Sequence, residues 1–525
     1  MSKHLIMTQK TSSIFKKSSD LAILTVISRI LGLVRESTTA ALLGTGVLAD
    51  VFSVSFMIPN MMRRLFAEGV ISAAFIPQFK GFVSENKKER AAEFLDAVFS
   101  VVTLLSFVTV LVLMLFSGNL VSLLAPSLDA ESAEDAAFLA KVMFPYIFFI
   151  TLAALTQGVL NSSDIFRPSG FSPIIFNLIF ISAAFLISPF TANPVHALSA
   201  GVLVGGSMQL FIQLPFLKKT FFRFRLISLK KAFSDPALKK LGKLIVAALF
   251  GTGAYQLNIL LTTNFASRAG VGVVSSLSFS ARIEEFVIGV FVISLSTVIL
   301  PELAENAKSK NFGKLSDNLD YALKFVAFVS IPATVFMLFN SDEIVRLLLG
   351  YGKFGETSVK LTSDALKFRI AGLFFIAVSR MMMSLFYAFE KTAVPIFAGL
   401  VSIVVNFAAA YFLVGTFSGR GIALAAAIAS FSCAAVLFTA FKIQFKNIAK
   451  LRKTFFVFLK ISLISAVSLI PSLLLKDCVY SFFGTVSLPR KICEICSFSA
   501  ISLVFAALFL GLSLLLKVRI SGNCR

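Results

Sequence analysis

Long apolar stretches separated by short polar links run along almost the whole chain. A helix needs about 20 mostly apolar residues to cross a membrane. Such stretches lie near 20–43, 48–79, 92–117, 136–162, 170–189, 195–217, 238–267, 272–301, 317–339, 359–389, 393–415, 420–444, 455–475 and 496–516. The pattern predicts an all-α polytopic membrane protein with about 14 transmembrane helices. It leaves no stretch for a separate soluble domain.

Composition agrees with this pattern and indicates an orientation. Of 525 residues, 57% are hydrophobic and 14% charged, and the net charge is +22. The positive charge lies mainly in alternate links rather than in one patch, so it indicates membrane orientation and not nucleic-acid binding. The basic links hold Lys16, Lys17, Lys80, Lys87, Lys88, Arg90, Lys218, Lys219, Arg223, Arg225, Lys230, Lys231, Lys442, Lys446, Lys450, Arg452 and Lys453. These links and both termini are predicted to be cytoplasmic, although Lys476, Arg490 and Lys491 run against the trend.

The chain repeats itself at an offset of about 224 residues. Leu95 and Asp96 match Leu319 and Asp320, and the segment from Met114 resembles the segment from Met337. Two parallel six-helix lobes with a site between them are typical of transporters. The predicted organisation is a cytoplasmic segment (1–18), an N-lobe (19–217), a basic cytoplasmic linker (218–236), a C-lobe (237–445) and two further spans with a cytoplasmic C-terminus (446–525).

Charged residues inside spans are costly and therefore informative. The spans near 20–43, 48–79 and 272–301 carry Arg29, Arg35, Glu36, Arg63, Arg64, Glu68, Arg282, Glu284 and Glu285. At 1.5 Å per residue, the arginines reach roughly 14 to 24 Å into the membrane. We expect them to line a wet cavity between the lobes. Because arginine binds phosphate oxygens bidentately, their surplus over nearby acids favours a phosphate or pyrophosphate ligand.

Each of these features also has a purely structural interpretation. Arg64 with Glu68 and Arg282 with Glu285 are spaced so that each pair can form on one helix face. Pro59 predicts a bend, which is either a hinge for alternating access or a static kink. Asp50 is by default a favourable charge at a helix N-terminus.

Residues suited to catalysis or to metal binding are scarce. The chain has two histidines and five cysteines, and Cys493 and Cys496 form a lone CxxC that lacks the second pair of a zinc site. We therefore expect a transporter rather than an enzyme, with no metal and no cofactor. Whether Cys493 and Cys496 form a disulfide stays open.

Several of these segments resemble the MurJ (MviN) lipid II flippases of bacterial peptidoglycan synthesis. They are SRILGLVRE from Ser28, the stretch from Ala49 through IPNMMRRLFAEGVISAAFIP, SARIEEF from Ser280 and YGKF from Tyr351. The resemblance implies a fold of the MOP exporter superfamily, with two extra helices that hold an undecaprenyl tail. It implies that Arg29, Arg35, Arg63 and Arg282 hold the pyrophosphate of lipid II. The resemblance also ties Asp50 and Glu68 to function. We predict that Asp50, Pro59, Asn60, Arg64, Glu68 and Glu285 have supporting or gating roles.

The resemblance also implies a location and a cycle. Lipid II would enter from the cytoplasmic side of the inner membrane and leave on the outer side, with the cell-wall synthesis machinery as a further partner. One departure concerns the sodium site proposed in some members, because the corresponding spans here offer Asn258, Asn264 and Asn406 rather than a central carboxylate. Coupling to the membrane potential or to a monovalent ion stays open.

Three other functions are compatible with parts of the pattern. Another transporter of the same architecture, such as an O-antigen lipid flippase or a multidrug exporter, would share the fold. A membrane enzyme acting on the same lipid would need acid/base or metal groups that the spans do not offer. A scaffold of the cell-wall machinery would leave the arginine surplus unexplained.

Overall fold

The computed structural model describes residues 2–65, 74–289, 305–306, 309, 312–445, 451–485 and 489–518. The described residues are almost entirely helical and include no strand, which confirms the prediction of an all-α protein. Contacts divide the chain into two compact units, Met1–Ser275 and Ser276–Arg525.

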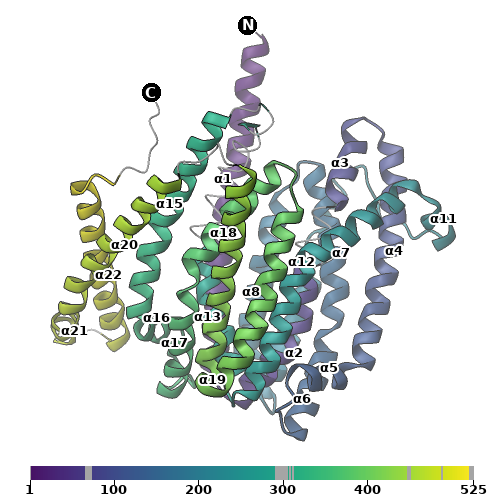
Figure 1. The fold of residues 1–525 in the computed structure, drawn as a ribbon. Coiled ribbons are helices and arrows are strands. Elements are labelled where there is room, and N and C mark those ends of the chain that lie inside the picture. Colours follow the sequence, from purple (N-terminus) through teal and green to yellow (C-terminus); the bar gives the residue numbers. More distant parts are fainter. Residues whose placement is uncertain are drawn as a thin grey trace. The chain divides into compact units, whose positions relative to one another are not determined.

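The first unit is a set of long helices with short helical segments at their ends (Figure 1). Its elements are α1 (Ser2–Leu43), α2 (Val47–Arg63), α3 (Ile76–Ser84), α4 (Lys88–Leu115), α5 (Ser117–Leu124), α6 (Ala130–Met143), α7 (Pro145–Ser162), α8 (Arg167–Leu186), the 3-10 turn η2 (Ser188–Phe190), α9 (Pro194–Phe211), α10 (Leu214–Leu217), α11 (Leu229–Ser234) and α12 (Pro236–Arg268). The first residues of α13 (Val273–Val287) also belong to it.

The second unit contains the rest of α13 and the helices that follow. They are α15 (Phe312–Phe339), α16 (Ser341–Leu349), α17 (Glu356–Ile370), α18 (Leu373–Ala388), α19 (Ala393–Gln444), α20 (Leu451–Leu474), α21 (Lys476–Gly484) and α22 (Arg490–Leu515). The long helix α19 is broken at Ser418, whose φ of 51° and ψ of −132° are not helical. This break falls between the predicted spans 393–415 and 420–444.

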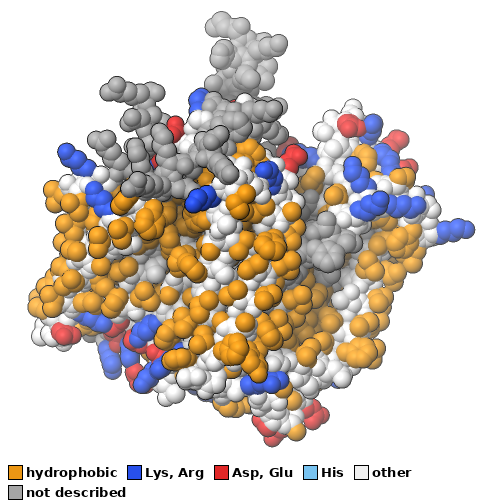
Figure 2. All heavy atoms as spheres, viewed as in Figure 1, with side chains coloured by type: hydrophobic (Ala, Val, Ile, Leu, Met, Phe, Trp, Pro, Cys, Tyr) orange, Lys and Arg blue, Asp and Glu red, His pale blue; other side chains and the backbone are white. Residues whose placement is uncertain are grey.

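Many of these helices are long and apolar enough to cross a membrane. Within the described residues, 8 helices pass this test, or up to 9 if α17 and α18, which meet at a bend of 45°, count as one span. Figure 2 shows apolar side chains covering α4 in the first unit and α15, α20 and α22 in the second. Leu105 on α4 and Leu503 on α22 are 58% and 70% exposed. Such faces suit lipid rather than water, and the total of about 14 spans stays a prediction.

Helix starts in the first unit follow from local sequence. The Asp129 side chain accepts a hydrogen bond of 3.0 Å from the Ser132 N–H and so caps α6. Pro145 and Pro194 occupy the first positions of α7 and α9, where a missing N–H has no consequence. Asp235 caps α12 in front of Pro236 by accepting from the Ala237 N–H at 2.7 Å.

Asp235 also ties the linker to α4. Both of its carboxylate oxygens accept hydrogen bonds from the Arg90 guanidinium, at 2.6 and 2.8 Å. Hydrogen bonding to this cation holds the pKa of Asp235 below its usual value of 3.8. Figure 1 shows α11 beside the N-terminal part of α4, where lysines and arginines gather in Figure 2.

The helices α20 and α22, which lie outside the sequence repeat, pack against α15. Ile461 and Ile464 of α20 and Phe509 of α22 form a buried cluster with Ala327 and Ile331 of α15. The two predicted C-terminal spans are therefore packed into the second unit through an apolar contact.

The sequence repeat corresponds to a repeated structure. Helices α4 and α15 each contain 28 residues and are followed directly by the short helices α5 and α16. In the first unit, the Asp96 carboxylate accepts a hydrogen bond of 3.1 Å from the Arg225 N–H in the segment after α10. In the second, the matching Asp320 accepts from the Thr454 hydroxyl of α20 at 2.6 Å. Each repeat therefore uses the same aspartate to hold the segment that leaves it.

Candidate functional site

Arg29 and Arg35 lie two turns apart on α1, and α8 packs against this part of the helix. The Asn177 side chain of α8 donates a hydrogen bond of 3.2 Å to the Ser28 carbonyl, next to Arg29. The Arg29 side chain is half-buried, and no described residue forms an ion pair with it. A cation in such a position is available to an anionic ligand.

Arg35 has partners that the sequence did not suggest. Its Nη2 lies 2.6 Å from Oε1 of Glu36, and both side chains are 18% exposed. The guanidinium carbon also lies 5.6 and 5.7 Å from the ring centres of Phe176 and Phe180 on α8. Neighbouring residues on a helix do not face each other, so only the reach of the two long side chains allows this pair. The charge of Arg35 is therefore partly offset.

The end of α2 carries the densest group of predicted site residues. Pro59 is buried inside the helix, and Arg63 donates long hydrogen bonds of 3.3 and 3.4 Å to the Asn60 side chain one turn earlier. Arg64 follows in a π-helical turn, a feature often found at functional sites. Glu68 lies outside the described residues, so its predicted pairing with Arg64 stays a prediction, as does the choice between hinge and kink at Pro59.

Asp50 does more than place a charge near the start of its own helix. Its carboxylate is 4% exposed and accepts hydrogen bonds from the backbone N–H groups of Gly272 at 2.6 Å and Ser275 at 2.8 Å. It thus caps the first turn of α13 from α2, more than two hundred residues away in sequence. Gly272 has φ +81°, and a Cβ there would lie 3.2 Å from the Thr45 carbonyl oxygen, so glycine allows the close approach.

In the second unit, Arg282 and Glu285 form the predicted pair on α13. The Arg282 Nη1 lies 2.9 Å from Oε2 of Glu285, and the side chains are 27% and 37% exposed. The internal pairing considered for these two residues is therefore present. The contact between Arg282 and a ligand stays a prediction.

Sequence reasoning missed the ion pair of Glu284. This carboxylate is 3% exposed and lies 2.5 Å from the Nε of Arg369 on α17. A fully buried acid is rarely stable without such a partner. The arginine lies inside the predicted span 359–389, but nothing in the sequence indicates which of the acids it meets.

The basic exceptions to the predicted orientation are also paired. Lys476 forms an ion pair with Glu343, and Arg490 and Lys491 lie 3.2 and 3.0 Å from Glu494. Each of these cations therefore has an acidic partner within the second unit, and the predicted orientation stays a prediction. Cys493 and Cys496 are not joined in a disulfide.

The arrangement in α1 and α2 favours an anionic ligand. Between Ile23 and Leu65 the chain has four arginines but only the acids Glu36 and Asp50, and Asp50 is occupied by the backbone of α13. Asn264 of α12, considered for a cation site, donates its side-chain amide to the Leu123 carbonyl at 2.6 Å. The described geometry suits phosphate oxygens better than a metal cation.

Comparison with known proteins agrees with this chemistry. The family model described as lipid II flippase MurJ matches residues 39–493. The chain is 37% identical to a probable lipid II flippase MurJ of Treponema pallidum over 473 residues, which covers 88% of each chain. It is 30% identical to the lipid II flippase MurJ of Burkholderia cenocepacia over 495 residues, covering 93% of this chain and 94% of that one.

Solved structures show the same fold. A lipid II flippase MurJ in an inward closed conformation has a TM-score of 0.76 at 24% identity, with 93% of this chain and 98% of that chain covered. An inward-facing multidrug resistance transporter of the MATE family, described as a member of the MOP superfamily, has a TM-score of 0.67 at 15% identity, with 82% of this chain and 98% of that chain covered. From the arginine-rich helices, the repeated units and these matches together, the chain belongs to the MurJ family of lipid II flippases.

Proposed function

We propose that this protein moves lipid II from the cytoplasmic to the outer leaflet of a bacterial inner membrane by alternating access. In this proposal, Arg29, Arg35, Arg63 and Arg282 contact the pyrophosphate of the lipid. The observation that carries it is the surplus of arginine in α1 and α2, in a chain of the MurJ family. A guanidinium supplies two parallel N–H donors to a phosphate group, and burial away from water strengthens this contact.

The four arginines have different roles in this proposal. Arg29, which has no ion-pair partner among the described residues, is the first contact for the pyrophosphate. Arg35 and Arg282 hold carboxylates at 2.6 and 2.9 Å, so the ligand must compete with Glu36 and Glu285 for them. Exchange of a carboxylate for a phosphate retains the charge balance at each arginine. Binding can therefore be released again, as transport requires.

Asp50 is proposed as a gating residue, with Pro59, Asn60, Arg64, Glu68 and Glu285 in support. Its contact with the first turn of α13 joins two spans at the ends that the predicted orientation places outside. Opening toward the outer side requires this contact to break. The proposal also includes cytoplasmic termini and an interaction with the cell-wall synthesis machinery.

The test is complementation in cells depleted of their own flippase, with lipid II in the outer leaflet as the readout. The unaltered chain should restore its appearance, whereas Arg29→Ala and Arg63→Ala should each reduce it at least about tenfold, the effect of losing one charge-assisted contact. Arg225→Ala is the matched control because this arginine is an exposed linker residue whose hydrogen bond to Asp96 comes from the backbone N–H, which alanine keeps.

Two outcomes would contradict the proposal. One is failure of the inserted, unaltered chain to restore lipid II in the outer leaflet. The other is normal transport by Arg29→Ala and Arg63→Ala at equal expression. Transport of an O-antigen lipid or a drug in place of lipid II by the purified protein would favour the other transporters of this fold.

A further inference from the structure

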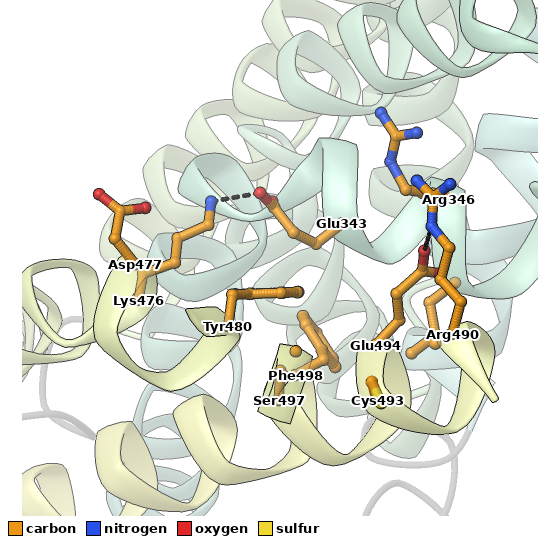
Figure 3. A pocket seen from close by; sticks show the side chains of 12 residues that line it. Glu343, Arg346, Lys476, Asp477, Tyr480, Arg490, Cys493, Glu494, Ser497 and Phe498 are labelled. Carbon is orange, nitrogen blue, oxygen red and sulfur yellow. Dashed lines mark hydrogen bonds and ion pairs between the residues drawn. The ribbon is translucent and has the colours of Figure 1, made fainter. Parts of the chain in front are cut away.

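A polar pocket lies in the second unit, between α16, α21 and the start of α22 (Figure 3). Its volume is about 420 Å³, and its lining includes Glu343, Arg346, Lys476, Tyr480, Arg490 and Ser497. None of these residues belongs to the predicted lipid II site. The pocket therefore requires an explanation of its own.

The pocket lies near the ends of two predicted spans, where a membrane boundary is expected. Helices α20 and α21 together, and α22, are apolar enough to be two spans, and the pocket lies where α21 ends and α22 begins. The surrounding surface carries exposed apolar side chains, with Leu474 77%, Phe482 65% and Ile495 44% exposed. Such a surface suits acyl chains next to a polar headgroup site.

The pocket carries both signs of charge. Glu343 and its ion-pair partner Lys476 have side chains 21% and 24% exposed, Glu494 is 18% exposed, and the Arg490 side chain at the rim is 87% exposed. Figure 3 shows the Tyr480 ring close to Glu343 within the pocket. A ligand with a cationic group inside and an anionic group at the rim complements this arrangement.

Three buried oxygens in the lining have no hydrogen bond among the described residues. Oε2 of Glu494 lies 3.0 Å from the Lys491 ammonium, so two of the three are left without a donor nearby. Glu343 uses Oε1 for its ion pair with Lys476, while its Oε2 has no partner. The Ser497 hydroxyl, in a residue with 0% exposure, also has none. Buried acceptors of this kind are unfavourable unless a donor reaches them. A primary ammonium group carries three N–H donors and would satisfy both.

We propose that this pocket binds the headgroup of a phospholipid with a primary amine, of the phosphoethanolamine class. The ammonium group contacts Glu343, Ser497 and Tyr480, and the phosphate contacts the guanidinium of Arg490, which engages Glu494 only through Nε. A phosphocholine headgroup has no N–H to offer to the two oxygens and binds more weakly. This lipid is distinct from the proposed cargo, so the inference does not depend on transport of lipid II.

Native mass spectrometry of the full-length protein with an equimolar mixture of phosphatidylethanolamine and phosphatidylcholine tests the proposal. The unaltered protein should favour the ethanolamine lipid about ten- to a hundredfold, the range for a charge-assisted hydrogen bond. Glu343→Gln should remove most of this preference. Tyr480→Phe keeps the ring and removes only the hydroxyl, so it should lower the preference even if Glu343→Gln fails to fold.

Asp364→Asn is the matched control, because it removes another paired carboxylate of the same unit, the partner of Arg420, away from the pocket. It should leave the lipid preference unchanged. Soluble O-phosphoethanolamine should bind much more weakly than the lipid, since it lacks acyl chains. Equal binding of the two lipids, or a preference unaltered in both Glu343→Gln and Tyr480→Phe, would overturn the proposal, and tight binding of the free headgroup would overturn the assignment to a lipid.

Discussion

Replacement of Asp50 by asparagine should loosen the first turn of α13. The carboxylate accepts two backbone hydrogen bonds at 2.6 and 2.8 Å, one on each oxygen, from a position 4% exposed to solvent. Asparagine has nearly the same shape but only one oxygen. One of the two N–H groups, of Gly272 or Ser275, would then face an amide nitrogen that cannot accept it.

The size of the effect follows from these contacts. A hydrogen bond to a charged group contributes about 1.5–3 kcal/mol, and a buried donor left without a partner costs about 1–3 kcal/mol. The interaction with the helix dipole also weakens, by about 0.3–1 kcal/mol. Asp50→Asn should therefore destabilise the contact by about 2–4 kcal/mol, which is roughly a 30- to 700-fold increase in its opening.

Hydrogen exchange of the purified protein measures this opening directly, because the amides of Gly272 and Ser275 are the donors. Peptides that cover residues 270–280 should exchange faster in Asp50→Asn by that factor. Asp129→Asn is the control, since Asp129 caps α6 from an exposed position. It should affect only the start of α6. Unaltered exchange at residues 270–280 in a folded Asp50→Asn protein would refute the reasoning.

Three further predictions concern the stability of the two units. Arg369→Ala leaves the Glu284 carboxylate, which is 3% exposed, without its ion-pair partner, and it should lower the free energy of unfolding by about 3–5 kcal/mol in thermal unfolding. The double variant Arg369→Gln with Glu284→Gln should recover most of this loss. Equal losses in the two variants would contradict the explanation. Because the pKa of Asp235 is lowered, its contribution to stability is present above its usual pKa of 3.8 and is lost as the pH falls through the lower folded value. Pepsin cleavage of the linker should therefore rise in that pH range in the unaltered protein. Asp235→Asn should be cleaved readily with little dependence on pH. Gly206→Ala places a Cβ 1.9 Å from the Tyr146 ring and should lower the free energy of unfolding by at least about 1–3 kcal/mol, measured by thermal unfolding. Gly399→Ala, whose Cβ would have nothing within 4 Å, should be neutral or stabilising in the same assay.

The features that depend on local sequence were predictable. Hydropathy indicated the all-α class, and the gap between the predicted spans at 415 and 420 anticipated the break at Ser418. The offset of about 224 residues between Asp96 and Asp320 anticipated two helices of equal length in the two units. The motifs near Ser28 and Ala49 indicated the family that the comparison then established.

The partners of the charged residues were predictable only where they lie on one helix face. Arg282 and Glu285 are three residues apart, so helix geometry brings them together. The contact between Glu284 and Arg369 depends on how α13 and α17 are rotated and shifted against each other. Hydropathy says little about this rotation, because α13 and α17 both carry polar and charged residues along their length.

By itself, the sequence determined that this chain is a membrane protein built of helices, that it contains a repeat, and that it belongs to an arginine-bearing family of flippases. These properties follow from composition, periodicity and motifs, which are read along one dimension. Only the tertiary structure decided that Asp50 caps α13 and that Glu36 offsets Arg35. It also assembled the α16, α21 and α22 pocket. The physical reason is that side-chain pairing depends on helix rotation and depth, which packing sets across hundreds of residues.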